Sequence, residues 1–146
     1  AEFYYNEDGH VTELRFLNRN GEPARGPDRQ FWQRREHDNG KSTVIRSLDR
    51  DNNLMNDAAG NAILHIEYDD RGFQTALTAF DKGNKRVLAS GGWSHATYKY
   101  DDNGNITDLR LFDVADTALN GPQGYHHLTM KYDDNGNNRF FKSYGR

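Results

Sequence analysis

The chain has 146 residues, a formal net charge of −3 and an apolar fraction of 34%. A slightly acidic chain offers no basic field for nucleic acid, and the sequence has no apolar run long enough for a membrane-spanning helix. Because it contains no cysteine, disulfides and thiolate metal sites are excluded. So few apolar residues suit thin, stacked units better than a thick globular core.

Turn glycines recur along the chain at spacings of 31, 32, 32 and 32 residues: Gly9, Gly40, Gly72, Gly104 and Gly136. The heptapeptide KYDDNGN surrounds two of them, at 99–105 and again at 131–137. Self-similarity at a fixed period is typical of repeat architectures. We predict one repeat domain over 1–146, with units of approximately 1–28, 29–60, 61–92, 93–123 and 124–146.

The first unit predicts a hairpin around Gly9. Asp-Gly and Asn-Gly pairs between alternating strands favour two-residue type I′ loops, which need positive φ at both loop residues. Such a loop at Gly9 places Phe3 opposite Leu14 and Tyr5 opposite Thr12. One face of the pair is then apolar, as a half-buried antiparallel pair requires.

The second unit, around Gly40, departs from this pattern. The same construction puts Arg34 opposite Ile45 and Glu36 opposite Thr43. Apart from Ile45, the main apolar contribution is Trp32. We expect this hairpin to be distorted or to form an irregular edge.

The third, fourth and fifth units return to regular hairpins. Two-residue loops ending at Gly72, Gly104 and Gly136 bring apolar residues to one face. A wrong register would send these residues to opposite faces, so the agreement between units supports the pairing. The predicted pairs are Tyr68 with Thr75, Ile66 with Leu77, Leu64 with Ala79, Tyr100 with Thr107, Tyr98 with Leu109, Ala96 with Leu111, and Met130 with Phe141.

Between the hairpins the chain is rich in turn-forming residues, at 18–21, 49–53 and 81–84. Small apolar clusters follow at Leu54-Met55, Val87-Leu88 and Ala118-Leu119, and we expect them to form a third, short strand over part of the apolar face. No segment shows a sustained helical period. The predicted fold is all-β: about four to five stacked antiparallel β-hairpin repeats, arranged as a solenoid or as an extended twisted sheet.

The frame Tyr-Asp-Asp-x-Gly-Asn, at 100–105 and 132–137 and nearly at 68–73, resembles bacterial YD-type repeats, the tyrosine-aspartate hairpin repeats of Rhs and teneurin-like proteins. The likeness includes Tyr68, Tyr100 and Tyr132 and covers most of the chain, although the period of 32 residues is longer than that of Rhs repeats. The resemblance implies a secreted or cell-surface scaffold or binding array, and no particular activity.

A candidate binding face comes from aromatic and histidine side chains near the start of two hairpins. Trp93 and Tyr125 are equivalent in the repeat, and stacked aromatics hold sugar rings, anchor protein interfaces or close the apolar face between repeats. His95 and His127 are also equivalent, and His126 adjoins them. Two or three imidazoles could bind zinc or copper, but no acidic partner occurs at a recognisable spacing, so surface histidines without a metal are favoured.

The paired carboxylates at Asp69-Asp70, Asp101-Asp102 and Asp133-Asp134 recur with the turn, which favours a structural role over an acid–base pair. A calcium loop with Gly104 at its sixth position would have Lys99 at its first, where a cation is repelled. The sequence has no nucleophile-elbow, zincin or phosphate-loop motif. We predict a non-enzymatic protein without a cofactor.

Neither end of the chain resembles a polar capping unit, so we expect a processed piece, or ends covered by another copy. The first functional hypothesis is an extracellular structural protein that self-associates head to tail and forms filaments. Two alternatives stay open. One is a monomeric binding module for a glycan or another protein, and the other is a scaffold fragment of a larger Rhs-like secreted polypeptide.

Overall fold

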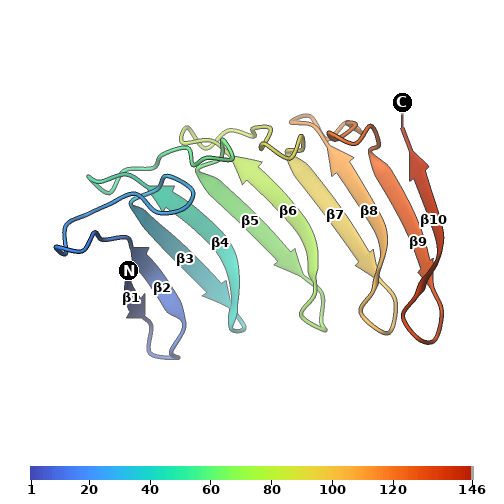
Figure 1. Ribbon diagram of the computed structural model, residues 1–146, viewed down its shortest axis with the longest axis horizontal. Helices are drawn as coiled ribbons and strands as arrows, with labels where there is room; N and C mark the ends of the chain where they lie inside the picture. The colour runs from blue at the N-terminus through green and yellow to red at the C-terminus, as the bar shows by residue number, and fades with distance from the viewer. Residues whose placement is uncertain (146) are drawn as a thin grey trace.

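The computed structural model describes residues 1–145 as one open antiparallel sheet, in which ten strands follow one another in chain order (Figure 1). The strands are β1 (Glu2–Tyr5), β2 (Val11–Arg15), β3 (Trp32–Asp38), β4 (Lys41–Leu48), β5 (Ile63–Tyr68), β6 (Gln74–Phe80), β7 (His95–Tyr100), β8 (Ile106–Phe112), β9 (His127–Tyr132) and β10 (Asn138–Tyr144). The all-β prediction of stacked hairpins is confirmed, and the sheet is extended rather than closed. Within residues 1–145 no helix has the length and apolar character of a membrane span.

Neighbouring hairpins join through a contact that is the same each time. The pairs between β8 and β9 are Asp108 with Thr129, Leu109 with Leu128, and Arg110 with His127. Three corresponding pairs join β2 to β3, β4 to β5, and β6 to β7. We call this three-pair contact the repeat junction. Because every junction is alike, the sheet grows by repeating one type of contact.

Most hairpin turns are five-residue loops, so the predicted two-residue loops are wrong. In the loop 101–105, the Asp101 N–H donates to the Asn105 carbonyl at 2.9 Å, and the Gly104 N–H donates to the Asp101 carbonyl at 3.1 Å. Asp101 Oδ1 accepts from the N–H groups of Asn103 and Asn105. Only Gly104 in this loop has a positive φ, of 83°. A carboxylate at the first position satisfies the N–H groups of a wider loop, which is why the type I′ turn does not form.

The wider loop adds a β-bulge to each of these hairpins. Away from the turn the pairs are as predicted, with Tyr98 opposite Leu109. Beside the turn, Tyr100 pairs with Ile106 instead of Thr107. The same one-residue shift gives Tyr5 and Tyr68 the partners Val11 and Gln74 in place of Thr12 and Thr75.

The hairpin around Gly40 lies inside the sheet with seven strand pairs and one bulge, as the other hairpins have, so the prediction of an irregular edge is wrong. Asn39 and Gly40 have φ values of 48° and 76° and form a two-residue loop between the paired residues 38 and 41. Strand β3 leaves only Asn39 before its turn glycine, whereas β1, β5, β7 and β9 each leave three residues for the wider loop. A bulge after Glu36 shifts the register by one residue from the prediction, and the observed partners are Ile45 for Arg35 and Val44 for Glu36.

Each connection between hairpins contains two further loops of the five-residue form. In the loop 81–85, Asp81 Oδ1 accepts from the N–H groups of Gly83 and Lys85. The next loop, 89–93, has its positive φ at Gly92. Between the two loops the chain makes one isolated β-bridge back to the end of the preceding hairpin. The predicted third strand is therefore reduced to this single bridge. The bridges pair Leu17 with Pro23, Leu48 with Leu54, Phe80 with Arg86, and Phe112 with Ala118.

The core lies where the strands meet the connections. Ala79, Ala96 and Ser94 are fully buried there. Successive connections also bind one another, since the Ala58 N–H donates to the Asp28 carbonyl and the Ser90 N–H to the Ala59 carbonyl. Figure 1 shows the connections in a row along one end of the sheet and the hairpin turns along the other. Each repeat is therefore fixed to the next at both ends of its strands.

The two faces of the sheet differ in chemistry, because residues directly opposite each other share a face. The apolar face runs through Leu14, Ile45, Leu64, Leu77, Ala96, Leu109 and Leu128. The polar face carries Arg15, Arg34, Arg46, His65, His95, Asp108 and His127. The chain is too short of apolar residues to cover both faces, which fits a single thin layer.

Candidate interaction surface

The hairpin turns of the first four repeats touch one another, and in each contact the residue after the turn glycine of one repeat lies against the turn glycine of the next. Phe73 stacks on Tyr100 of the next repeat with ring centroids 4.9 Å apart. It also covers Gly104, where an added Cβ would come within 2.8 Å of the Phe73 ring. Lys41 lies in the same way against Gly72 and Tyr68, and His10 against Gly40 and His37. The turn glycine thus provides both its positive φ and room for the preceding repeat.

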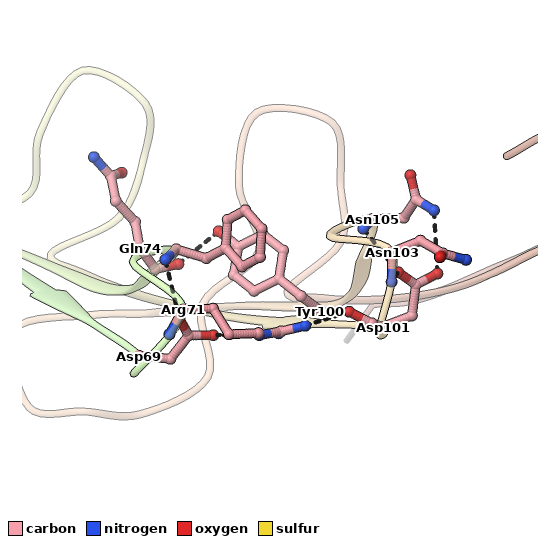
Figure 2. Close-up of polar contacts among 8 residues, drawn as sticks. Asp69, Arg71, Gln74, Tyr100, Asp101, Asn103 and Asn105 are labelled. Atoms are coloured by element: carbon pink, nitrogen blue, oxygen red, sulfur yellow. Dashed lines mark hydrogen bonds and ion pairs between the residues drawn. The ribbon is translucent and has the colours of Figure 1, made fainter.

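Arg71 adds a polar link to this contact (Figure 2). Its Nη1 donates to the Asp101 carbonyl at 2.7 Å, and its Nη2 lies 3.2 Å from Asp69 Oδ2. The guanidinium also lies 4.9 Å from the Phe73 ring centroid, in cation–π geometry. Desolvation of the Asp69 carboxylate raises its pKa, but hydrogen bonds from the Phe73 N–H and the Arg71 guanidinium outweigh this effect and hold the pKa of Asp69 below its usual value. The loop carboxylate therefore stays ionised and holds both its own loop and the arginine.

Tyr68 and Tyr100, the last residues of β5 and β7, each fasten their repeat to the one before it. The Tyr68 hydroxyl donates to the Ser42 carbonyl at 2.8 Å. The Tyr100 hydroxyl donates to the Gln74 carbonyl at 2.6 Å, as Figure 2 shows. Burial raises the pKa of Tyr100, so the hydroxyl remains a donor. We call this hydrogen bond the tyrosine latch. Tyr132 does not make it, because its hydroxyl lies 3.5 Å from Met130 Sδ.

The two edge strands carry exposed aromatic side chains. Every residue of β1 and of β10 is exposed. The exposed fractions are 53% for Phe3, 60% for Tyr5, 47% for Phe140 and 57% for Phe141. At an interior junction the place of Phe141 is taken by Leu109, which is half-buried against the next hairpin. The edges therefore present surface that the interior of the sheet covers.

Trp93 and Tyr125 occupy equivalent places, as the sequence indicates, but these places are in the connections. Each is the last residue of a five-residue loop and is half-buried. The Trp93 ring lies over Gly91, and the Tyr125 hydroxyl donates to Gln123 Oε1. Tyr125 also lines a cavity of about 270 Å³ with Leu111, Gly121 and Pro122. Both aromatic rings thus contribute to the packing of the connections.

The three histidines near these aromatics do not meet. His95 and His127 lie on the polar face, where they pack against Phe112 and Tyr144 at centroid distances of 5.5 and 4.8 Å. His126 points to the other side of the strand and hydrogen-bonds to Asn120 Oδ1. No group of three His, Cys, Asp or Glu residues in the described chain is arranged to hold a metal.

His95 and His127 have polar partners from the neighbouring strand. His95 Nδ1 lies 2.9 Å from Thr78 Oγ1, and His127 Nε2 lies 2.8 Å from Asp108 Oδ2. Desolvation raises the pKa of Asp108, but hydrogen bonds from His127 and Arg110 outweigh it, so the pKa of Asp108 is lowered. These pairs lie at the repeat junctions, so their geometry serves the cohesion of the sheet.

The structure also reveals two features that the sequence did not indicate. His10 and His37 stack with ring centroids 5.3 Å apart, and burial, His10 and Arg35 together lower the pKa of His37. Beside them, a cavity of about 620 Å³ separates the second and third hairpin turns and includes Lys41 and Tyr68 in its lining. Both depend on contacts between repeats. The only sequence signal was the shared place of His10 and Lys41, which each directly follow a turn glycine.

No protein-family model matches the chain, and a search of curated proteins finds no relative. Function must therefore be inferred from the geometry of the chain itself.

Proposed function

We propose that this protein is a non-enzymatic structural repeat protein that self-associates through the two edges of its sheet. The observation that carries the proposal is the exposure of large aromatic side chains on both edge strands. An unpaired edge presents free N–H and C=O groups to other strands, and natural proteins usually protect such edges with lysine, proline or a covering loop. Strand β1 contains neither lysine nor proline.

The polar side chains that could perform chemistry are engaged in folding, which favours a structural role. The Asn105 N–H lowers the pKa of Asp101, and the Asn137 N–H does the same for Asp133, so both carboxylates are fixed in their loops. A general acid or base instead needs a pKa near the working pH and access to a substrate.

An extracellular or cell-surface setting is part of the proposal. It is supported by the Tyr-Asp turn frame, which resembles the YD-type repeats of secreted scaffolds. The same resemblance supports a role for the sheet as a scaffold within a larger secreted polypeptide. Self-association and a scaffold role both depend on the ability of the sheet to extend.

A second candidate function, binding of a glycan, is favoured by the cavity of about 620 Å³ between the second and third hairpin turns. Its lining combines Tyr68 and Ile66 with hydrogen-bonding groups of Asp38, Asn39 and Asp70. An aromatic ring beside convergent polar groups is typical of sugar sites. Titration calorimetry against a glycan set, repeated with Asp70→Ala, tests it: heat of binding that the substitution removes would support this function.

Sedimentation velocity over a concentration series tests self-association. We expect larger species as the concentration rises, and we expect Phe141→Lys to remove them because it replaces an exposed apolar side chain of the β10 edge with a third cation beside Arg139 and Lys142. Val114→Lys is the matched control, since Val114 is 48% exposed and lies in a connection away from both edges. A wild-type chain that remains monomeric at every concentration would refute the proposal.

A further inference from the structure

The internal junctions define which residues of the two edges correspond to one another. Within the last two hairpins, Leu109 faces Tyr98 and Phe141 faces Met130, so Phe141 holds the place of Leu109. At the other edge Phe3 faces Leu14 as Met130 faces Phe141, so Phe3 holds the place of Met130. Ala1 lies two residues before Phe3, as Leu128 lies two residues before Met130, and therefore holds the place of Leu128. Leu109 pairs with Leu128 in the last repeat junction. A further junction of this type would therefore pair Phe141 with Ala1, and Phe140 with Glu2.

The same correspondence applies to the tyrosine latch. Tyr5 is the last residue of β1 and stands beside a bulge, as Tyr68 and Tyr100 do in their strands. The latch acceptors Ser42 and Gln74 are the residues that pair with His37 and Tyr68 beside the bulge. Asn138 pairs with Tyr132 in that position. Tyr5 is 60% exposed and Asn138 lies on the open edge, so a donor and an acceptor of the latch face outward at opposite ends of the sheet.

On this basis we infer that one copy adds to the next through an intermolecular repeat junction, in which β10 of one copy pairs with β1 of the next and Tyr5 of the second copy latches onto the Asn138 carbonyl of the first. The inference rests on the proposed self-association and specifies its partner strands and its register.

The charges of the two edges favour this arrangement over pairing between like edges. Strand β10 carries Arg139 and Lys142, whereas β1 carries Glu2 as its charged residue. Pairing of β10 with a second β10 would bring four cations together, and like charges on facing strands are destabilising. Lys142 stands two residues along from Phe140, on the same face, and so lies diagonal to Glu2 in the inferred register.

Disulfide trapping tests the register, because the chain has no cysteine of its own. Glu2 and Phe140 lie on opposite edges of the sheet, so a Glu2→Cys/Phe140→Cys variant can form its designed bridge only between copies. Facing residues of an antiparallel pair have Cα atoms about 4.5–5.5 Å apart, within the range of a disulfide. We expect a ladder of oligomers on a non-reducing gel after mild oxidation. The shifted control Glu2→Cys/Phe141→Cys, with side chains on opposite faces, is expected to give none.

Tyr5→Phe tests the latch by the same sedimentation assay. Loss of one hydrogen bond is expected to weaken association about threefold to tenfold. Tyr125→Phe is the control, since Tyr125 lies in a connection away from both edges and its hydroxyl donates to Gln123 Oε1 of the same loop.

Three outcomes overturn the inference. They are a ladder only from the shifted pair, equal ladders from both pairs, and association that ends at a dimer. Oligomers in sedimentation without a ladder from the Glu2→Cys/Phe140→Cys variant would refute the register and leave self-association intact, whereas a wild-type monomer would refute the proposed function itself.

Discussion

Replacement of Gly104 by alanine tests the contact between hairpin turns most directly. Gly104 has a φ of 83° and lies beneath Phe73 of the preceding repeat. Alanine in a left-handed conformation is destabilised by about 1–2 kcal/mol. Its Cβ would also come within 2.8 Å of the Phe73 ring, so the ring must retreat by about 0.6 Å to reach an ordinary contact.

The retreat disturbs the stacking of Phe73 on Tyr100, and such aromatic pairs contribute about 0.5–1.5 kcal/mol. We therefore expect Gly104→Ala to lower the free energy of unfolding by about 1.5–3.5 kcal/mol in total. Gly136→Ala is the matched control, because Gly136 has a φ of 79° and its added Cβ meets nothing within 4 Å. It has only the backbone term, about 1–2 kcal/mol.

The assay is urea unfolding followed by circular dichroism and tryptophan fluorescence, with a double-mutant cycle between Gly104→Ala and Phe73→Ala. Removal of the ring removes the clash, so the two substitutions should cost less together than the sum of their separate effects. Additive effects in the cycle, together with equal destabilisation by Gly104→Ala and Gly136→Ala, would show that the turns do not press on one another.

Three further predictions concern the links between repeats. Tyr100→Phe removes a latch and should lower the free energy of unfolding by about 0.5–1.5 kcal/mol in urea titrations, while Tyr132→Phe, which has no latch, should have a smaller effect. Arg86→Met breaks the hydrogen bonds to Ser94 Oγ and to Asp116 of the next connection, and it should lower the free energy of unfolding by about 1–3 kcal/mol. The control is Lys85→Met, which changes the exposed neighbouring residue. Burial, His10 and Arg35 lower the pKa of His37, so the folded chain binds a proton at His37 more weakly than the unfolded chain does. The free energy of unfolding should therefore fall as the pH drops from about 6.5 toward the lowered pKa of His37. Urea midpoints at pH 7.5 and pH 5 measure the slope, which His37→Gln should reduce; an unchanged slope would contradict the role of the stacked pair.

The period of the glycines and the alternation of apolar residues were enough to predict the five hairpins and, away from the turns, the register of four of them. Tyr98 opposite Leu109 follows from these patterns alone. The wider loops were not predicted, although the hairpin loops and the first loop of each connection carry a signal: an Asp or Asn at the first position and a residue that tolerates positive φ at the fourth. Asn84 and Asp116 take that fourth position in the connections, with φ values of 60°. The preference for Asn-Gly in two-residue turns concealed this wider frame.

The contacts between repeats could not be derived from the sequence in the same way. The equivalence of Trp93 and Tyr125 is visible in the spacing, but their surroundings depend on how the connections fold back. The tyrosine latch depends on the bulge, which moves Tyr100 against Gln74 of the preceding hairpin. The latch joins residues 26 positions apart in neighbouring repeats, so it requires the offset of the repeat junction, and no local pattern encodes that offset.

The position of the two chain ends on opposite edges of the sheet has a mechanical consequence (Figure 1). A pull on both ends acts across the strands, so it opens the hydrogen bonds of a hairpin in succession rather than shearing them all at once. Each repeat that opens releases 32 residues, or about 105–115 Å of extended chain. Because each repeat contacts only its neighbours, the remaining repeats keep their structure. The sheet would lengthen under load in equal steps and shorten again on release, like an extensible tether.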